Sequence, residues 1–256
     1  MGEPLEEFVS KLISLSVVDE TGAARLPPER ELGVALGISR GALREQLSQL
    51  DSLGALRRRR GHGSYLDAPD VSFIRTYFAL MRQLNRLSDD EFSSARAMLE
   101  AMVSGTAAIL ATESDVQVLR DLVYKMIAHT RAGDAEKALE ADMEFHSYLY
   151  TIVDNPIFNM MNEGLSHVLR DNMRARRALA ISIESPSTDG SMNTDAVHFE
   201  IVKAIEAHDA DAANAAMRRH FDDFSLLALR ARSEETQPGK RSPNNEKRPL
   251  ATEEIE

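Results

Sequence analysis

Helical patterns follow one another without interruption from Val71 to about residue 231. Apolar residues recur there at helical spacing, and no convincing strand separates the segments. The breaks between them carry helix-ending and helix-starting signals, among them Gly133-Asp134 and Asn155-Pro156. Helices are predicted over about residues 71–86, 89–111, 114–132, 135–153, 156–183, 192–207 and 210–231. This succession predicts an all-α antiparallel bundle of six or seven helices within residues 69–231.

The first 68 residues carry shorter and more varied elements. Helices are predicted over about residues 4–16, 28–36 and 40–53, with Gly37 ending the second and Ser39 capping the third. Two short strands follow, over residues 55–60 and 64–66, around a glycine-rich turn. Helix, tight turn, helix and hairpin form a winged helix-turn-helix, whose second helix enters the major groove of DNA. The chain is therefore predicted to be mainly α-helical, with a DNA-binding domain over residues 1–68.

Composition agrees with this fold class and narrows the chemistry. Aromatic residues make up only 5% of the chain, and Trp is absent, which favours helices over a β-sandwich or barrel. The absence of cysteine excludes thiolate catalysis, disulfides and iron–sulfur clusters. The N-terminus has no secretory signal and no stretch is long enough to span a membrane, so we expect a soluble cytoplasmic protein. Residues 232–256 are polar, and we expect them to form a disordered tail.

The net charge of −11 taken alone argues against nucleic-acid binding, because the phosphate backbone attracts positive charge. The charge is unevenly distributed, however, since six arginines lie between Arg40 and Arg60 against two acidic residues. Arg40 and Arg44 are four residues apart and share one face at the start of the second helix. Arginine there can pair with a guanine edge or clamp a phosphate, and Ser39 can cap the helix and contact a phosphate. The alternative, two ordinary solvated charges, is weaker because a wing follows directly.

The wing contains four consecutive arginines, residues 57–60, before the turn Gly61-His62-Gly63. Successive side chains of a strand point to opposite faces, so only some of these arginines can face DNA at once. Arg60 and His62 are favoured because they lie at the tip. The alternative for His62 is a solvated turn residue.

Residues 26–66, LPPERELGVALGISRGALREQLSQLDSLGALRRRRGHGSYL, resemble the winged helix-turn-helix of GntR-superfamily bacterial transcription regulators. The resemblance implies a homodimer bound to a palindromic, double-stranded operator, with the wing tip in the minor groove. The sequence departs from the family pattern at Gly41, where a side chain is usual, and at residues 16–25, which replace the usual turn. The predicted DNA-binding residues are Arg30, Ser39, Arg40, Gly41, Arg44, Arg60, Gly61, His62 and Gly63.

Polar groups on apolar helical stripes mark a second site. Asp142 and His146 lie four residues apart on one predicted helix, and His198 and His220 lie on the apolar faces of two others. A single such histidine is more often a hydrogen-bonded core residue, and Asp142 with His146 alone fits an Asp–His hydrogen bond. All four together favour a metal, since buried carboxylates need a partner and bundle interiors commonly hold metals. Three imidazoles and one carboxylate suit zinc first, with Ni, Mn, Co or Fe as alternatives.

The C-terminal region resembles the FCD effector-binding domain of the FadR subfamily. The resemblance rests on ARAMLE at 95–100, DMEFH at 142–146, HFEIVKAI at 198–205 and the A-x-x-A-M-x-x-H pattern at 213–220. It implies that Asp142, His146, His198 and His220 are metal ligands, and that Arg96 faces an effector cavity. Arg96 with Glu100 otherwise forms an ordinary i,i+4 pair. We expect Arg170, Asn172 and Arg174 to join Arg96, and a small carboxylate to be the effector because metal and guanidinium are both positive.

These features favour a ligand-responsive, metal-containing transcription regulator that is not an enzyme. The alternative is a metal-dependent enzyme with an appended DNA-binding domain. No general base stands out beside the metal, because Glu144 lies two residues after Asp142 and points away from it on a helix. An architectural DNA-binding protein is a third and weaker interpretation, given the inward polar cluster.

Overall fold

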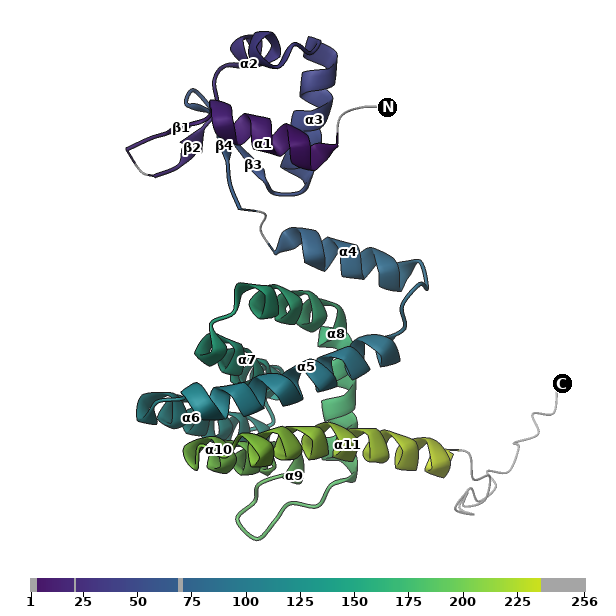
Figure 1. The fold of residues 1–256 in the computed structure, drawn as a ribbon. Coiled ribbons are helices and arrows are strands. Elements are labelled where there is room, and N and C mark those ends of the chain that lie inside the picture. Colours follow the sequence, from purple (N-terminus) through teal and green to yellow (C-terminus); the bar gives the residue numbers. More distant parts are fainter. Residues whose placement is uncertain (1–3, 21, 69–70, 236–256) are drawn as a thin grey trace, which may run out of the picture.

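The computed structural model describes residues 4–20, 22–68 and 71–235, and it consists of a small N-terminal unit and a larger helical unit joined through one helix (Figure 1). The N-terminal elements are α1 (Leu5–Leu15), β1 (Val17–Val18), β2 (Ala24–Arg25), α2 (Glu29–Leu36), α3 (Arg40–Ser52), β3 (Leu56–Arg59) and β4 (Gly63–Leu66). The core of this N-terminal unit, called the DNA-binding unit below, consists of buried apolar side chains: Phe8, Leu12, Leu26, Leu32, Leu43, Leu47, Leu50 and Leu56.

The predicted helix-turn-helix and wing are confirmed. Gly37 adopts a left-handed φ of 67° and ends α2, which suits a residue without a side chain. The Ser39 hydroxyl accepts a hydrogen bond from the Ala42 amide at 3.2 Å and caps α3. β3 and β4 pair antiparallel as the wing hairpin.

A second hairpin was not predicted. β1 and β2 pair antiparallel within residues 17–25, and β2 also pairs with β4, so the sheet has the order β1-β2-β4-β3. Each new strand has only two residues, which is too short for an alternating pattern to be recognised. This hairpin occupies the segment that replaces the usual turn before α2.

The larger unit is the predicted all-α bundle. Its helices are α4 (Ser72–Gln83), α5 (Asp89–Leu110), α6 (Glu113–Arg131), α7 (Ala135–Val153), α8 (Pro156–Ile183), α9 (Asn193–Ala196), α10 (His198–Glu206) and α11 (Ala210–Glu235). Capping boxes at Ser88 and Thr112 start α5 and α6, and Asn155 caps α8. The single helix expected over 192–207 is divided at Val197 into α9 and α10. No helix in the described ranges is long and apolar enough to cross a membrane.

The boundary expected at residue 231 lies within α11, which continues to Glu235. The rest of the predicted tail, residues 236–256, lies outside the described residues.

The helix that follows the wing, α4, packs against α8 (Figure 1). Gly164 of α8 permits this contact, because a Cβ at that position would lie 2.8 Å from two ring carbons of Phe78. Arg75 of α4 also forms an ion pair with Glu163 of α8. The connecting helix is thus attached to the same helix that, further along, borders the candidate site.

Candidate DNA-binding face and metal centre

The start of α3 presents an exposed positive surface. Arg40 and Gly41 are exposed, and nothing but the Ser39 hydroxyl, at 3.9 Å, lies near the place a Cβ of Gly41 would take. The Arg44 side chain is 73% exposed, and its Nε donates to Glu29 at 3.1 Å. Within the part of the chain that the structure describes, Arg30 and Arg40 form no ion pair. Their charge is therefore available to a polyanion.

The wing tip is formed by a turn that requires glycine. Gly61 and Gly63 adopt φ values of 79° and 103°, a region that other residues rarely enter. The exposed His62 between them contacts the Arg60 carbonyl through Nδ1 at 3.2 Å, and its own carbonyl accepts from the Tyr65 hydroxyl. These bonds fix the tip at the end of the sheet.

The four wing arginines differ in their surroundings, as strand alternation predicts. Arg57 pairs with Asp67, Arg58 with Glu29, and Arg59 lies over the Tyr65 ring at 4.8 Å. Arg60, next to the tip, forms no ion pair with any described residue.

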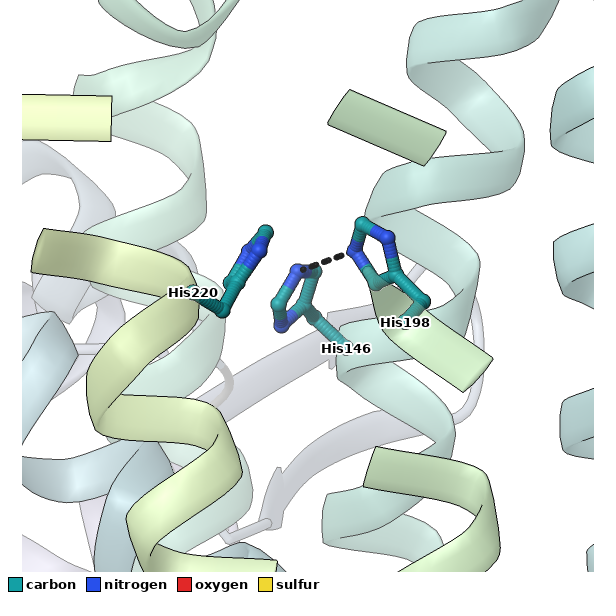
Figure 2. A group of neighbouring side chains, drawn as sticks. All are labelled: His146, His198 and His220. Atoms are coloured by element: carbon teal, nitrogen blue, oxygen red, sulfur yellow. Dashed lines mark hydrogen bonds between the residues drawn. The ribbon is translucent and has the colours of Figure 1, made fainter. Parts of the chain in front are cut away.

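Three imidazoles meet inside the bundle, from α7, α10 and α11 (Figure 2). His146, His198 and His220 are 2%, 0% and 4% exposed, and ligand atoms of the three rings lie within 4.8 Å of one another. The Nε2 atoms of His146 and His198 are 3.4 Å apart. Such a cluster in an apolar interior is costly unless its polar atoms share a partner.

Hydrogen bonds on the far side of two rings determine which nitrogens face the centre. His198 Nδ1 lies 3.0 Å from the Asp195 carbonyl, and since a carbonyl only accepts, this nitrogen carries the hydrogen. His146 Nδ1 lies against the Glu100 carboxylate. The Nε2 atoms of the two rings face each other at the centre. Two nitrogen lone pairs at this separation need a shared proton or a cation between them, and the outer bonds are typical of metal-binding histidines.

Asp142 lies beside two of the three imidazoles. Its Oδ1 lies 3.1 Å from His198 Nε2 and 3.7 Å from His146 Nε2. Ligands about 2.0–2.1 Å from a tetrahedral ion lie about 3.3 Å apart, so these spacings fit one ion. Burial raises the pKa of Asp142, but His198 and His146 outweigh it and hold the pKa well below its usual value. Burial and the other two imidazoles lower the pKa of His220. The lowered pKa values of Asp142 and His220 favour the unprotonated forms of these two groups, which are the forms that bind metal.

Glu100 is a member of the site that sequence reasoning underestimated. It is fully buried, accepts from Arg96 Nε at 2.5 Å and contacts His146. Burial raises its pKa, but Arg96 and His146 outweigh that effect, so the pKa lies below its ordinary value. The i,i+4 spacing of Arg96 and Glu100 indicated the pair, but not that it lies inside the bundle. Glu100 therefore links the arginine to a candidate metal ligand.

A small cavity of about 40 Å³ lies beside the imidazoles. Its wall contains Asp142, His146 and His220 on one side, and Arg96 and Asn172 among the other residues. Two neighbouring arginines of α8, Arg176 and Arg177, also line it. Three guanidiniums and a candidate metal centre thus line one small cavity.

Two of the residues expected in this cavity lie elsewhere. Arg170 and Arg174 bind Glu136 of α7 at the protein surface and do not line the cavity. Arg174 and Arg170 together lower the pKa of Glu136 to about 2. Residues 170 and 174 are four positions apart on α8, so both side chains reach Glu136 of α7.

Arg177 lines the cavity instead. It follows two other arginines, Arg174 and Arg176, yet it is only 4% exposed. Its Nη2 donates to Asp195 and, at 2.8 Å, to the Thr130 hydroxyl. The apolar stripe Leu165, Leu169 and Met173 continues to position 177 at four-residue steps, and this signal could have identified it.

Asp195 binds two partners of the site. Its side chain holds Arg177, and its main-chain carbonyl accepts from His198. Sequence patterns gave no indication of this role, because α9 has only four residues.

Comparison with known proteins agrees with this architecture. The family model "FCD domain" matches residues 91–223, and the model "Bacterial regulatory proteins, gntR family" matches residues 21–66. The chain belongs to the GntR family of bacterial regulators and has an FCD domain. The histidine cluster and the cavity lie in the FCD domain of this GntR-family regulator, and the exposed arginines of α3 and the wing lie in its GntR domain.

Individual relatives of this GntR-family regulator are also regulators. LutR of Bacillus subtilis is 26% identical over 77% of this chain and 88% of its own length. The Uxu operon transcriptional regulator of Escherichia coli is 27% identical over 80% of this chain and 78% of its own. The solved structure titled "Streptococcus agalactiae GntR" has 27% identity and a TM-score of 0.59, and it covers 89% of this chain and all of that one.

Proposed function

We propose that this GntR-family protein is a metal-containing transcription regulator that binds a palindromic operator in the cytoplasm as a homodimer and responds to a small carboxylate. The observation that carries the proposal is the cavity whose wall joins a histidine cluster, Asp142 and three arginines. A regulator requires coupling between such a ligand site and a DNA-binding face.

The exposed groups of α3 and the wing support DNA binding. Arg40 and Arg44 would contact base edges or phosphates in the major groove, and the wing tip would enter the minor groove. The proposed contact residues remain Arg30, Ser39, Arg40, Gly41, Arg44, Arg60, Gly61, His62 and Gly63. Every one of them is exposed, as such contacts require.

Asp142, His146, His198 and His220 would hold one divalent metal, zinc first, with Ni, Mn, Co or Fe as alternatives. Bound there, the metal supplies a positive charge at the cavity wall. Arg96, Asn172, Arg176 and Arg177 would then orient a carboxylate ligand, because guanidiniums form strong charge-assisted hydrogen bonds with carboxylates. Arg170 and Arg174 would not contact this ligand, since they bind Glu136 at the protein surface.

Helix α8 offers a physical connection between ligand and DNA. Its cavity residues lie near positions 169–177, while Gly164 and Glu163 contact α4. The helix α4 in turn follows the wing strand β4 with a short connection. A ligand that displaces α8 would displace α4 and change the placement of the DNA-binding unit.

Two exposed apolar stripes support a homodimer. Phe73, Tyr77, Leu80 and Leu84 lie along α4 at helical spacing and are 42–65% exposed. Met98, Met102 and Ile109 form a similar stripe on α5. Exposed apolar surface of this kind marks an interface. Met102→Glu should raise the dimer dissociation constant, measured by light scattering after gel filtration.

The decisive experiment measures DNA binding, the response to a ligand and the dependence on metal together. Duplexes are selected from a random pool by the purified protein, and binding to the enriched duplex is titrated with small hydroxy, keto and sugar acids, with and without chelator. We expect one acid to change DNA affinity only while metal is present. A protein that enriches a duplex but ignores every acid would retain DNA binding and lose the proposed ligand response.

An enzymatic function has weaker support. Glu144, two residues after Asp142 on the same helix, is exposed and binds Lys125. The matched relatives are named as regulators.

A further inference from the structure

One carboxylate joins three elements of the DNA-binding unit. Glu29, the first residue of α2, accepts from Arg44 of α3 at 3.1 Å through Oε2 and from Arg58 of β3 at 3.4 Å through Oε1. The Glu29 side chain is 35% exposed, against 73% for Arg44. The recognition helix and the wing are thus connected through a single acidic side chain.

An acid in this position needs an explanation. Phosphates repel a carboxylate, so Glu29 weakens attraction between this face and any DNA. The positive end of the α2 dipole favours acids in its first turn, which would suffice as a reason for a glutamate there. Glu31, however, lies in the same turn and satisfies that preference without any ion pair among the described residues. The dipole therefore does not explain why Glu29 binds two arginines.

The hydrogen-bond pattern suggests a different role. Glu29 accepts the Nε hydrogen of Arg44, and neither terminal nitrogen of this guanidinium bonds to a residue that the structure describes. Those two nitrogens are the pair that binds guanine O6 and N7 together. An unrestrained arginine samples many rotamers and can clamp any nearby phosphate, whereas a held one presents its terminal nitrogens in one direction.

We propose that Glu29 is a positioning residue that determines operator specificity. It orients Arg44 for base contacts and holds Arg58 of the wing in place relative to α3. It also reduces indiscriminate phosphate binding. The proposal rests on the DNA-binding function proposed above. It assigns Glu29 no direct contact with DNA.

The test compares two variants that remove the same charge from the same helix turn. Glu29→Ala and Glu31→Ala are titrated against the duplex enriched by the wild-type protein and against a scrambled duplex of equal length, at several salt concentrations. Glu31→Ala should strengthen binding to both duplexes by one common factor, because it removes only a repulsive charge. Glu29→Ala should strengthen binding to the scrambled duplex and reduce the ratio of enriched to scrambled affinity roughly tenfold.

Two further variants keep the outcome interpretable. Glu29→Gln retains one acceptor oxygen and should give an intermediate ratio. In an Arg44→Ala background, Glu29→Ala should cause little additional loss of discrimination, because its main target is absent. Unchanged melting temperatures confirm that the unit folds.

Equal ratios for Glu29→Ala and Glu31→Ala would overturn the proposal and leave Glu29 as a surface charge. A wild-type protein that enriches no duplex would overturn the DNA-binding function itself, and that failure appears before any variant is made.

Discussion

The two units of this protein place their arginines in opposite environments. In the DNA-binding unit, Arg40 and Arg60 are exposed, and the core beneath them is entirely apolar. In the FCD domain, Arg96 and Arg177 are almost fully buried and each has an acidic partner, Glu100 and Asp195. Exposed charge suits a polyanion that approaches from solvent, while enclosed charge suits a small anion that must leave water.

The difference has an energetic consequence. Removing an exposed arginine should weaken DNA binding without affecting folding, because solvent compensates the change. Removing one member of a buried pair leaves an uncompensated charge in the interior, so folding and binding are affected together. Variants of the two units should therefore separate into two classes.

The largest effect is expected at the buried pair of Asp195 and Arg177. Asp195→Ala should reduce the free energy of unfolding by about 3–5 kcal/mol, because Arg177 stays buried without its carboxylate. Chemical denaturation measures it. The double variant Asp195→Leu, Arg177→Met should be considerably more stable than Asp195→Ala; if the two are equally unstable, lost packing and not the stranded charge is responsible.

Metal removal should have the next largest effect on stability, and it should destabilise only the FCD domain. At a metal concentration of about 100 times Kd, binding contributes about 2.7 kcal/mol to stability, which a chelator removes. We expect about one metal per chain by elemental analysis and a lower melting temperature with chelator. His198→Ala should melt at the same temperature with or without chelator. A metal-free wild type whose melting ignores both chelator and added metal would leave the cluster as a hydrogen-bonded core.

Arg40→Ala tests the exposed arginines of the DNA-binding unit. It should cost about 1–3 kcal/mol of binding to the enriched duplex while the melting temperature stays unchanged. Gel-shift titration at fixed salt measures the loss. Arg86→Ala removes the same charge from an exposed position outside the DNA-binding unit and is the matched control. Equal losses in the two variants would mean that only net charge matters.

The smallest effect is expected at the surface pairs of Glu136. Arg170→Ala and Arg174→Ala should each change the free energy of unfolding by only about 0–1 kcal/mol, as exposed pairs do. Neither should change the affinity for the carboxylate ligand measured by calorimetry, whereas Asn172→Ala and Arg176→Ala should weaken it. If Arg170→Ala lost ligand affinity and Arg176→Ala did not, the ligand would instead bind at the residues expected from the sequence.

The sequence predicted more of the fold than of the site. Helices with long periodic patterns and strong caps, such as the one that starts at Ser88, were predicted to within a few residues. The β1–β2 hairpin and the break at Val197 were missed because short elements carry no detectable period. Such features depend on tertiary pairing, which a local pattern does not record.

The metal-ligand candidates were recognisable because polar groups on an apolar stripe are conspicuous in a sequence. Arg177 was missed since its neighbours Arg174 and Arg176 are also arginines, and composition alone does not distinguish a buried member of such a run from exposed ones. Asp195 was missed because its role depends on contacts with α8 and α10 that are distant from it in sequence or made by its main chain.

Gly164 has a consequence for how this protein tolerates variation. It lies outside the cavity and far along the chain from the DNA-binding face, yet any side chain there would meet the Phe78 ring. Side-chain volume at this one position therefore acts as a graded spacer between α8 and α4. A series from alanine through serine to valine would move α4 away from α8 in steps, while both candidate binding surfaces keep their own residues.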